Sequence, residues 1–273
     1  MAYPIPEVRQ RFAKRDAILY ALSVGLGQDP IDEGQLDFVD HHRILQAMPS
    51  MAVVLGHPGF WLADERTGVD AVRLVHGEQS IELRRALPVE GEVMGRTRIT
   101  GLADKGPGKA ALLFTEKEGT GELLAVTRAT TFLRGGGGFG GAAASPGPHA
   151  MPSSAPDLVI DLPTRSEQAL YYRLNGDDNP LHADPTTAAR AGFPRPILHG
   201  LCTFGVVTHA LLRGLAGYAT TSLRRVGLRF SAPVFPGEAI RTEIWQGGSF
   251  RARIVERDAI VVDNGLAVFG DPA

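Results

Sequence analysis

Cysteine is almost absent from this sequence: Cys202 is the only one among 273 residues, so the chain cannot form an internal disulfide. Disulfides persist in oxidising compartments, and residues 1–15 contain no apolar run of the kind that a secretory signal needs. These two absences predict a protein of the reducing cytoplasm.

Long hydrophobic runs and clusters of one charge are also missing. No stretch of about 18 apolar residues is present, which is the length that a membrane-spanning helix needs. The formal net charge is only −2, and no run of about five like charges occurs. We therefore expect no membrane association and no nucleic-acid partner.

Glycine and proline are abundant, with 33 and 19 residues, in a chain that is otherwise 44% hydrophobic and 21% charged, as globular proteins are. Residues 135–156 are especially rich in them and read GGGGFGGAAASPGPHAMPSSAP. A segment with so few side chains to bury is typical of a linker. It predicts an N-terminal unit over residues 1–134 and a C-terminal unit over residues 157–273, each long enough to bury a core.

The two units resemble copies of one another. Three short matches occur in the same order in both units, with an offset of about 150 residues. They pair residues 17–25 with 169–177, 50–54 with 203–207, and 86–92 with 232–238. Each match is weak alone, but three in the same order favour an internal duplication.

Each copy has the pattern of a helix, a loop, a second helix and then strands. Residues Leu201–Leu212 are apolar on nearly every side, which predicts a buried helix. Alternating apolar and polar residues predict strands after it, and Asp263–Gly265 contains the Asn-Gly pair of a tight hairpin. The predicted strands are 239–245, 250–254, 260–262 and 266–269 in the second copy, and 81–83, 93–99, 110–115 and 123–133 in the first. The predicted fold class is therefore α+β.

The densest group of polar side chains lies in residues 172–184, where Asn-Gly and Asn-Pro pairs break the preceding helix and predict a loop. Asp177, Asn179 and His182 stand close together there, and the first copy has nothing comparable at the matching place. The fold therefore does not require this cluster, which makes it a candidate active site. The buried helix begins nearby, and the N–H of Gly200 at its start can face a developing negative charge.

Residues 176–182 carry the motif Gly-Asp-x-Asn-Pro-Leu-His, which strongly resembles the signature of the (R)-specific enoyl-CoA hydratase 2 family, within the MaoC-like dehydratases. Residues 74–79, 104–106 and 132–141 are similar to first-half motifs of the same family, so the resemblance covers nearly the whole chain. It implies a double hotdog fold, in which two antiparallel sheets each wrap a central helix and are joined by the linker. It also implies that the acyl-CoA site is lined by His76, Gly77, Lys105 and Phe230.

The resemblance implies reversible hydration of a trans-2-enoyl-CoA to the (R)-3-hydroxyacyl-CoA, a step of fatty-acid β-oxidation. Asp177 and His182 would hold one water and exchange protons with it, and either can be the formal base. Asn179 would orient the water or the thioester, and the N–H of Gly200 would bind the thioester oxygen. CoA is part of the substrate, so we expect no cofactor and no metal, and we expect a homodimer with one active site per chain.

Other functions remain as alternatives. A hotdog thioesterase would attack the carbonyl of an acyl-CoA and would not need the complete motif. A dehydratase of a polyketide, acyl-carrier-protein or sterol side-chain intermediate would use the same chemistry on another substrate. A non-catalytic acyl-CoA-binding subunit would not need both Asp177 and His182. We expect Cys202 to be a packed thiol on the buried helix, and His199, which has no evident partner in the sequence, to be structural or exposed.

Overall fold

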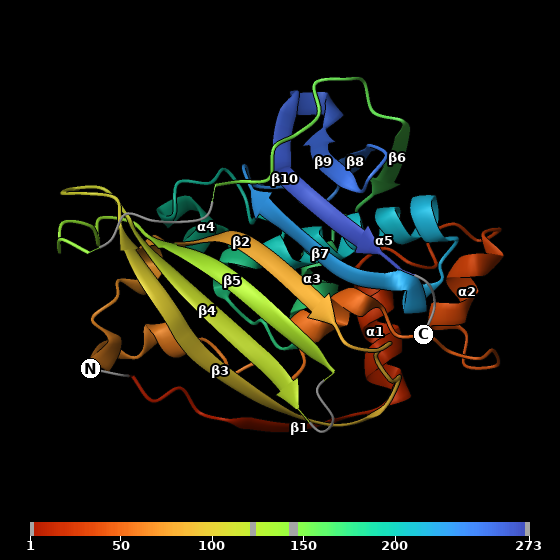
Figure 1. The fold of residues 1–273 in the computed structure, drawn as a ribbon, viewed down its shortest axis with the longest axis horizontal. Helices are drawn as coiled ribbons and strands as arrows, with labels where there is room; N and C mark the ends of the chain where they lie inside the picture. Colours follow the sequence, from red (N-terminus) through yellow and green to blue (C-terminus); the bar gives the residue numbers. More distant parts are fainter. Residues whose placement is uncertain (1–2, 121–123, 142–146, 271–273) are drawn as a thin grey trace.

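The computed structural model describes residues 3–120, 124–141 and 147–270, and its main feature is one antiparallel sheet of ten strands. Their order across the sheet is β1-β3-β4-β5-β2-β7-β10-β9-β8-β6 (Figure 1). The strands are β1 (Val8–Phe12), β2 (Leu74–Leu83), β3 (Gly91–Asp104), β4 (Ala111–Thr120), β5 (Ala125–Leu133), β6 (Leu158–Pro163), β7 (Leu223–Phe230), β8 (Ala239–Ile244), β9 (Ser249–Ile254) and β10 (Ala259–Phe269). Buried residues alternate with more exposed ones along β2 and β8, because one face of the sheet is covered.

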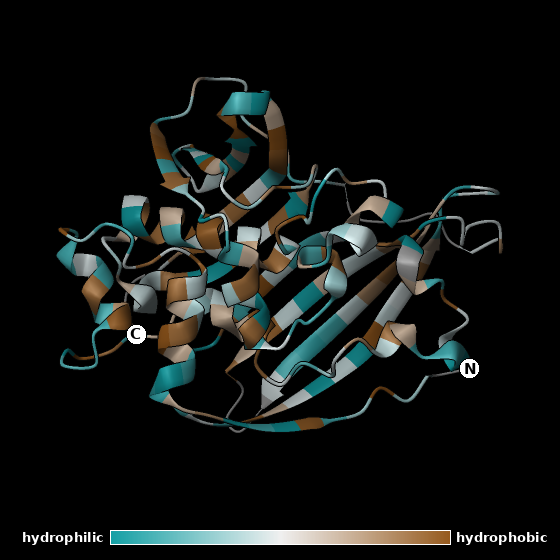
Figure 2. Ribbon diagram, turned by 180° about the vertical axis from the view of Figure 1, so that it is seen from behind, coloured by the Kyte–Doolittle hydropathy of each residue, from teal (hydrophilic) through white to brown (hydrophobic). Residues whose placement is uncertain are grey.

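Helices provide that cover. The α-helices are α1 (Lys14–Ser23), α2 (Glu33–Val39), α3 (Gln168–Tyr172), α4 (Pro185–Arg190) and α5 (Gly200–Ala216). Helices α1, α3 and α5 lie behind the sheet in Figure 1 and in front of it in Figure 2, which shows the molecule from behind. Short 3-10 helices connect the elements: η1 (Pro49–Val53), η2 (Trp61–Ala63), η3 (Glu65–Thr67), η4 (Ala71–Arg73), η5 (Arg173–Asn175), η6 (Pro180–His182), η7 (Thr220–Ser222) and η8 (Val255–Arg257). Among the described residues, no helix has the length and apolar character needed to cross a membrane.

The order of the strands repeats. From outer edge to centre, the first half reads β1-β3-β4-β5-β2, and the second half reads β6-β8-β9-β10-β7. Each strand of one half thus holds the place of its counterpart in the other, as a duplication predicts. The inner strands β2 and β7 pair from Glu78↔Arg229 to Glu82↔Arg225. The two predicted sheets are therefore joined edge to edge into one.

Matched residues of the two halves meet at the centre of the molecule. Asn175 donates from Nδ2 to the hydroxyl of Ser23 at 2.9 Å, and these two residues occupy equivalent positions in the duplicated alignment. Tyr20 and Tyr172 are likewise equivalent, and their rings pack edge to face with centroids 6.1 Å apart. Both tyrosines are fully buried. Helices α1 and α3 therefore pack against each other about an approximate two-fold axis.

The predicted buried helix is confirmed in the second half as α5, in which every residue from Cys202 to Leu212 is buried. The expectation of a comparable central helix in the first half is corrected: its counterpart is η1, a 3-10 helix of five buried residues. The chain turns away at Gly56, where φ is 60°. A side chain on Gly56 or Gly95 would collide with the backbone of the other, so the close contact of these glycines ends the helix.

A buried ammonium group donates hydrogen bonds to backbone carbonyls at the end of η1 that have no partner within the helix. Lys117 of β4 donates from Nζ to the carbonyl oxygens of Ala52 (2.9 Å), Val53 (3.0 Å) and Leu55 (2.6 Å). Three acceptors match the three N–H groups of a protonated lysine. Burial opposes the charge and lowers the pKa of Lys117 to about 7. Lys117 therefore supplies the donors that the N–H groups of a further helical turn would otherwise supply.

The Asn-Gly pair near the C-terminus forms a bulge and not the predicted hairpin. Strand β10 continues from Ala259 to Phe269, with a register shift against β7 between Asp263 and Leu266. Asn264 has φ 55°, and a Cβ on Gly265 would lie 2.4 Å from the ring of Phe250. Asn-Gly supplies the backbone conformations of a bulge as readily as those of a hairpin turn.

The predicted linker is tied to the fold at both ends. Its described parts, 135–141 and 147–156, contain no helix or strand, and residues 142–146 lie outside the described residues. The Asp104 carboxylate accepts from the N–H groups of Gly138 and Gly140, both at 2.7 Å. Near the other end, Trp245 Nε1 donates to the carbonyl of Ser154 at 2.9 Å.

We predict that Lys117→Met destabilises the fold by on the order of 3 kcal/mol, because it leaves buried carbonyls without donors. Urea unfolding at pH 7 measures this loss. Lys109→Met, on an exposed turn, is the matched control and should change the free energy of unfolding little.

The free energy of unfolding that Lys117→Met loses should also increase with pH. The pKa of Lys117 is about 7 in the folded protein, below the ordinary value of about 10.4 in the unfolded chain. Between these values the unfolded state binds more protons, so the contribution of Lys117 to stability rises with pH. The stability gap between wild type and Lys117→Met should therefore widen from pH 7 to pH 9. A constant or narrowing gap would contradict a depressed pKa.

Candidate active site

The polar loop is shaped by its own side chains. Helix α3 and the short η5 end at Gly176, where φ of 106° turns the chain away. The Asn179 side-chain oxygen accepts from the N–H of Leu181 at 3.0 Å and so caps η6, which carries His182. The Asp177 Oδ1 accepts from the N–H of Asn179 at 3.3 Å. The capping residues of the motif thus fix Asp177 and His182 on one compact turn.

His182 is held in one tautomer. Its Nδ1 lies 2.9 Å from the carbonyl oxygen of Ile197, and because a carbonyl can only accept, Nδ1 must carry the proton. The lone pair of Nε2 is then free to accept a proton from another group. Burial lowers the pKa of His182 below its ordinary value, although the Ile197 carbonyl and the charge of Asp177 act in the opposite direction. His182 is therefore a neutral base at pH 7.

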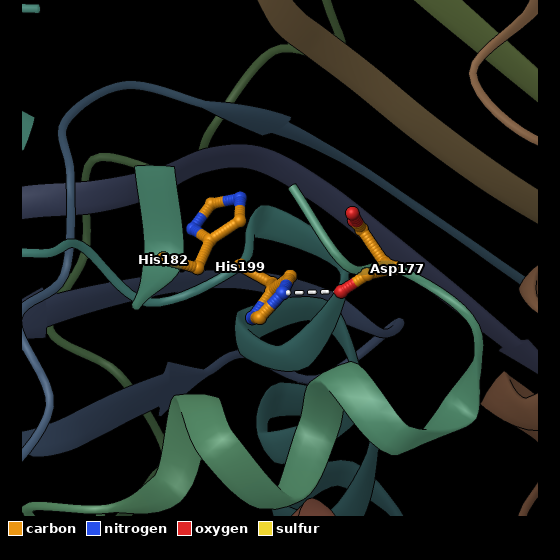
Figure 3. Close-up of side chains that lie close together, drawn as sticks. All are labelled: Asp177, His182 and His199. Atoms are coloured by element: carbon orange, nitrogen blue, oxygen red, sulfur yellow. Dashed lines mark hydrogen bonds between the residues drawn. The ribbon is translucent and has the colours of Figure 1, made fainter. Parts of the chain in front are cut away.

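A second imidazole lies against His182. His199 stacks on it with ring centroids 3.7 Å apart and 27° between the ring planes. One carboxylate oxygen of Asp177 and one ring nitrogen from each histidine all lie within 4.8 Å of one another (Figure 3). We expected His199 to be structural or exposed, and this position in the site was not predicted. The one signal in the sequence was that His199 immediately precedes Gly200, at the start of the buried helix.

The start of α5 forms the next wall of the site. Among the described residues, the N–H of Gly200 has no hydrogen-bond partner, as is usual in the first turn of a helix. A Cβ on Gly200 would lie 3.5 Å from the ring of Phe230, at the end of β7. Phe230 in turn packs edge to face on His76 of β2, with centroids 5.1 Å apart. Residues of both halves therefore meet at the helix start.

Two histidines of the first half lie within electrostatic range of Asp177. Burial lowers the pKa of His76, and the charge of Asp177 acts against that shift. Desolvation by the surrounding protein also lowers the pKa of His57, with Asp177 again acting in the opposite direction. The His57 side chain is nevertheless exposed to solvent. His57 was not among the predicted site residues, because nothing in the local sequence relates it to the loop.

Two predicted site residues have other surroundings. A Cβ on Gly77 would lie 2.2 Å from the Phe132 ring, so this glycine lets Phe132 pack across a bulge in β2. The Lys105 side chain is exposed and makes no hydrogen bond or ion pair with the described residues. The contacts of the structure therefore connect Asp177 and His182 through His199 to the neighbouring Gly200, and Gly200 to Phe230 and His76, but they do not connect Lys105 to this group.

By residue type, Asp177, His182 and His199 could bind a metal ion. Their arrangement fits one poorly. The two rings are stacked with only 27° between their planes, whereas two imidazole ligands of one ion direct in-plane lone pairs at the same point. In addition, His182 Nδ1 and His199 Nε2 already donate to backbone carbonyls.

Both halves match known families. The family model of the MaoC like domain matches residues 149–266, and that of the MFE-2 hydratase 2 N-terminal domain matches residues 11–135. A solved Mycobacterium tuberculosis protein described as having a double hotdog fold shares 15% identity and a TM-score of 0.57, over 99% of this chain and 95% of that one. The expected double hotdog fold is confirmed.

Similar proteins with named activities cover almost the whole chain. The 3-hydroxyacyl-thioester dehydratase Y of Mycobacterium tuberculosis is 41% identical, over 93% of this chain and 92% of its own. The peroxisomal enoyl-CoA hydratase 2 of Arabidopsis thaliana is 38% identical, over 96% and 92%. A solved MaoC-like dehydratase from Phytophthora capsici is 31% identical with a TM-score of 0.86, over 98% and 95%. This chain belongs to the hydratase 2 family of MaoC-like dehydratases.

The geometry of the loop makes a prediction about His182 alone. An NMR pH titration should give its imidazole a pKa below about 6.5, because burial disfavours the charged form. Asp177→Asn should lower that pKa further, since the Asp177 charge favours the imidazolium. Asp178→Asn, on the exposed neighbouring residue, is the control and should shift it less. An unchanged or higher pKa in Asp177→Asn would show that the two groups do not interact as described.

Proposed function

We propose that this protein catalyses the reversible addition of water to a trans-2-enoyl-CoA, giving the (R)-3-hydroxyacyl-CoA, with Asp177 and His182 as the proton-exchanging groups. It is an enzyme of the enoyl-CoA hydratase class, a hydro-lyase, as its family is. The observation that carries the proposed roles is that a carboxylate oxygen of Asp177 lies within 4.8 Å of a ring nitrogen of His182, whose Nε2 lone pair is free because Nδ1 donates to Ile197.

The reaction requires three things of the site. Water must add its oxygen to C3, C2 must receive a proton, and the thioester oxygen gains negative charge between these steps. A water held by Asp177 and His182 can give a proton to one of them as its oxygen adds to C3, and that proton can then pass to C2, directly or by way of the other group, so that both groups end in their starting state. Nothing is consumed beyond water, so no further reactant is needed.

The remaining assignments concern binding. The free N–H of Gly200, at the positive end of α5, is the donor that we assign to the thioester oxygen. Asn179 uses its side-chain oxygen as a cap, so its amide nitrogen is available to orient the water or the thioester. We assign His76 and Phe230 to the wall of the acyl-CoA pocket, and Gly77 to the same stretch of β2. Exposed Lys105 would meet a CoA phosphate as a mobile charge.

We also propose one active site per chain, because Gly25 and Pro30 stand where the duplicated alignment would need Asp177 and His182. The second half then supplies the chemistry, and the first half supplies His76 and much of the pocket. A cytoplasmic homodimer acting in fatty-acid β-oxidation is part of the same proposal. Several relatives, among them the Arabidopsis thaliana enzyme, are peroxisomal by name, so the compartment must be tested in its own right.

Two alternatives can be separated by their products. A thioesterase would release free CoA thiol from a saturated acyl-CoA, whereas a hydratase would release none. The name of the Mycobacterium tuberculosis relative specifies a thioester and no carrier, so acyl-carrier-protein, polyketide and sterol side-chain substrates belong in the same assay panel. Loss of absorbance of the conjugated thioester reports hydration in each case.

We predict that Asp177→Asn and His182→Ala each lower kcat on an enoyl-CoA by on the order of a hundredfold to ten-thousandfold, the usual contribution of an acid–base group. The controls are Asp178→Asn and His42→Ala, which change exposed residues of the same types and should keep wild-type rates. Circular dichroism checks that all four variants fold. If Asp177→Asn or His182→Ala retained near wild-type kcat, the proposed roles would be wrong.

The stereochemistry gives an independent prediction. Water activated from the one side of the pocket that carries Asp177 and His182 should give a single enantiomer, and the resemblance to the (R)-specific hydratases implies that it is the (R)-3-hydroxyacyl-CoA. An (S)-specific 3-hydroxyacyl-CoA dehydrogenase should therefore produce no NADH with this product, whereas an (R)-specific dehydrogenase should. NADH formation with the (S)-specific enzyme would rule out the proposed product.

A further inference from the structure

We propose that His199 is a positioning residue for this active site: it holds the Asp177 main chain and the His182 ring in one fixed relation without exchanging protons itself. This proposal rests on the proposed function only where it concerns turnover. The physical claim, that His199 sets the coupling between Asp177 and His182, stands on the geometry of the loop and of the helix start.

The first observation is the hydrogen bond between His199 and the loop. His199 Nε2 lies 3.2 Å from the backbone carbonyl oxygen of Asp177 (Figure 3), and the carbonyl can only accept, so Nε2 donates. His199 is also the N-cap residue of α5, immediately before Gly200. The hydrogen bond therefore fixes the Asp177 backbone to the same helix start that carries the free N–H of Gly200.

The second observation is the stacking on His182. His182 is fixed at Nδ1 by the carbonyl of Ile197, but one hydrogen bond still allows the ring to rotate about it. The face of His199, 3.7 Å away, removes that freedom. With both contacts in place, Nε2 of His182 keeps one direction relative to Asp177. Small displacements of such a pair cost a large factor in rate.

The third observation is that His199 is unsuited to proton transfer. It is 1% exposed, and burial together with the neighbouring His182 lowers its pKa to about 3. Its Nδ1 is buried without a partner among the described residues, and its ring also packs against that of Tyr172, with centroids 5.0 Å apart. A neutral ring that cannot ionise suits a support behind His182, since a charged one would oppose protonation of His182.

The test is a double-mutant cycle read by NMR. In wild type, the lowering of the His182 pKa by Asp177→Asn measures the coupling of the two groups. His199→Phe keeps a flat ring but removes the donor, so Asp177 is released and the same lowering should shrink to half or less. His209→Phe is the matched control: His209 is also 1% exposed and lies on α5, but its Nε2 contacts the Tyr218 hydroxyl. It should leave the coupling intact.

Kinetics provide the second readout. His199→Phe should lower kcat on an enoyl-CoA by on the order of 10- to 100-fold while KM changes by less than about threefold, because the groups are displaced and not removed. His199→Gln places an amide N–H near the position of Nε2 and should recover part of the coupling and of kcat. If His199→Phe fails to fold, the coupling between Asp177 and His182 and the kcat are compared between His199→Gln and wild type instead.

The outcomes separate the two proposals. Reduced coupling and reduced kcat in His199→Phe, with neither in His209→Phe, support positioning. Unchanged coupling with unchanged kcat would overturn it, as would a loss of coupling of equal size in His209→Phe. If the coupling falls as expected but Asp177→Asn keeps full activity, the positioning role of His199 stands and the proposed function fails.

Discussion

The hydrogen bonds between β2 and β7 are the constraint on which the rest of the molecule depends. They join the central strands of two duplicated halves, with Glu78 paired to Arg229 and Glu82 to Arg225. This register places His76, just before the paired segment of β2, beside Phe230 at the end of β7. Without the join, each half would expose a strand edge and the site would lose one wall.

The two halves differ in the length of the central helix that packs on the sheet. The second half keeps a central helix of 17 residues and presents its start to the catalytic loop. In the first half, the close contact of Gly56 and Gly95 stops the equivalent segment after five residues, and the Lys117 ammonium bonds to its carbonyls. Contacts such as that of Ser23 with Asn175 still preserve the symmetry at the centre, where a change on one side would need a matching change on the other.

Burial, more than charge, sets the chemistry of the site. The pKa values of His76, His182 and His199 are all lowered chiefly by burial. Imidazoles that remain neutral at pH 7 can accept protons and hydrogen bonds from an uncharged substrate and water. Because these imidazoles are neutral, the Asp177 carboxylate is the main fixed charge among the site side chains. Asp177→Asn removes that charge and is therefore expected to change the pKa of His182 directly.

Local chemistry determined much of this structure. The all-round apolar pattern of 201–212 dictated a buried helix, and Asn-Gly and Asn-Pro dictated the loop that holds Asp177 and His182, because side-chain burial and backbone preference act over a few neighbouring residues. The tertiary structure decided what depends on distant partners. The Asn-Gly pair at 264–265 became a bulge because β7 and β9 pair on both sides of it, and the first central helix stopped at a contact with Gly95. His199 joined the site only because the start of α5 packs beneath a loop 22 residues away in the sequence, a proximity that no local pattern encodes.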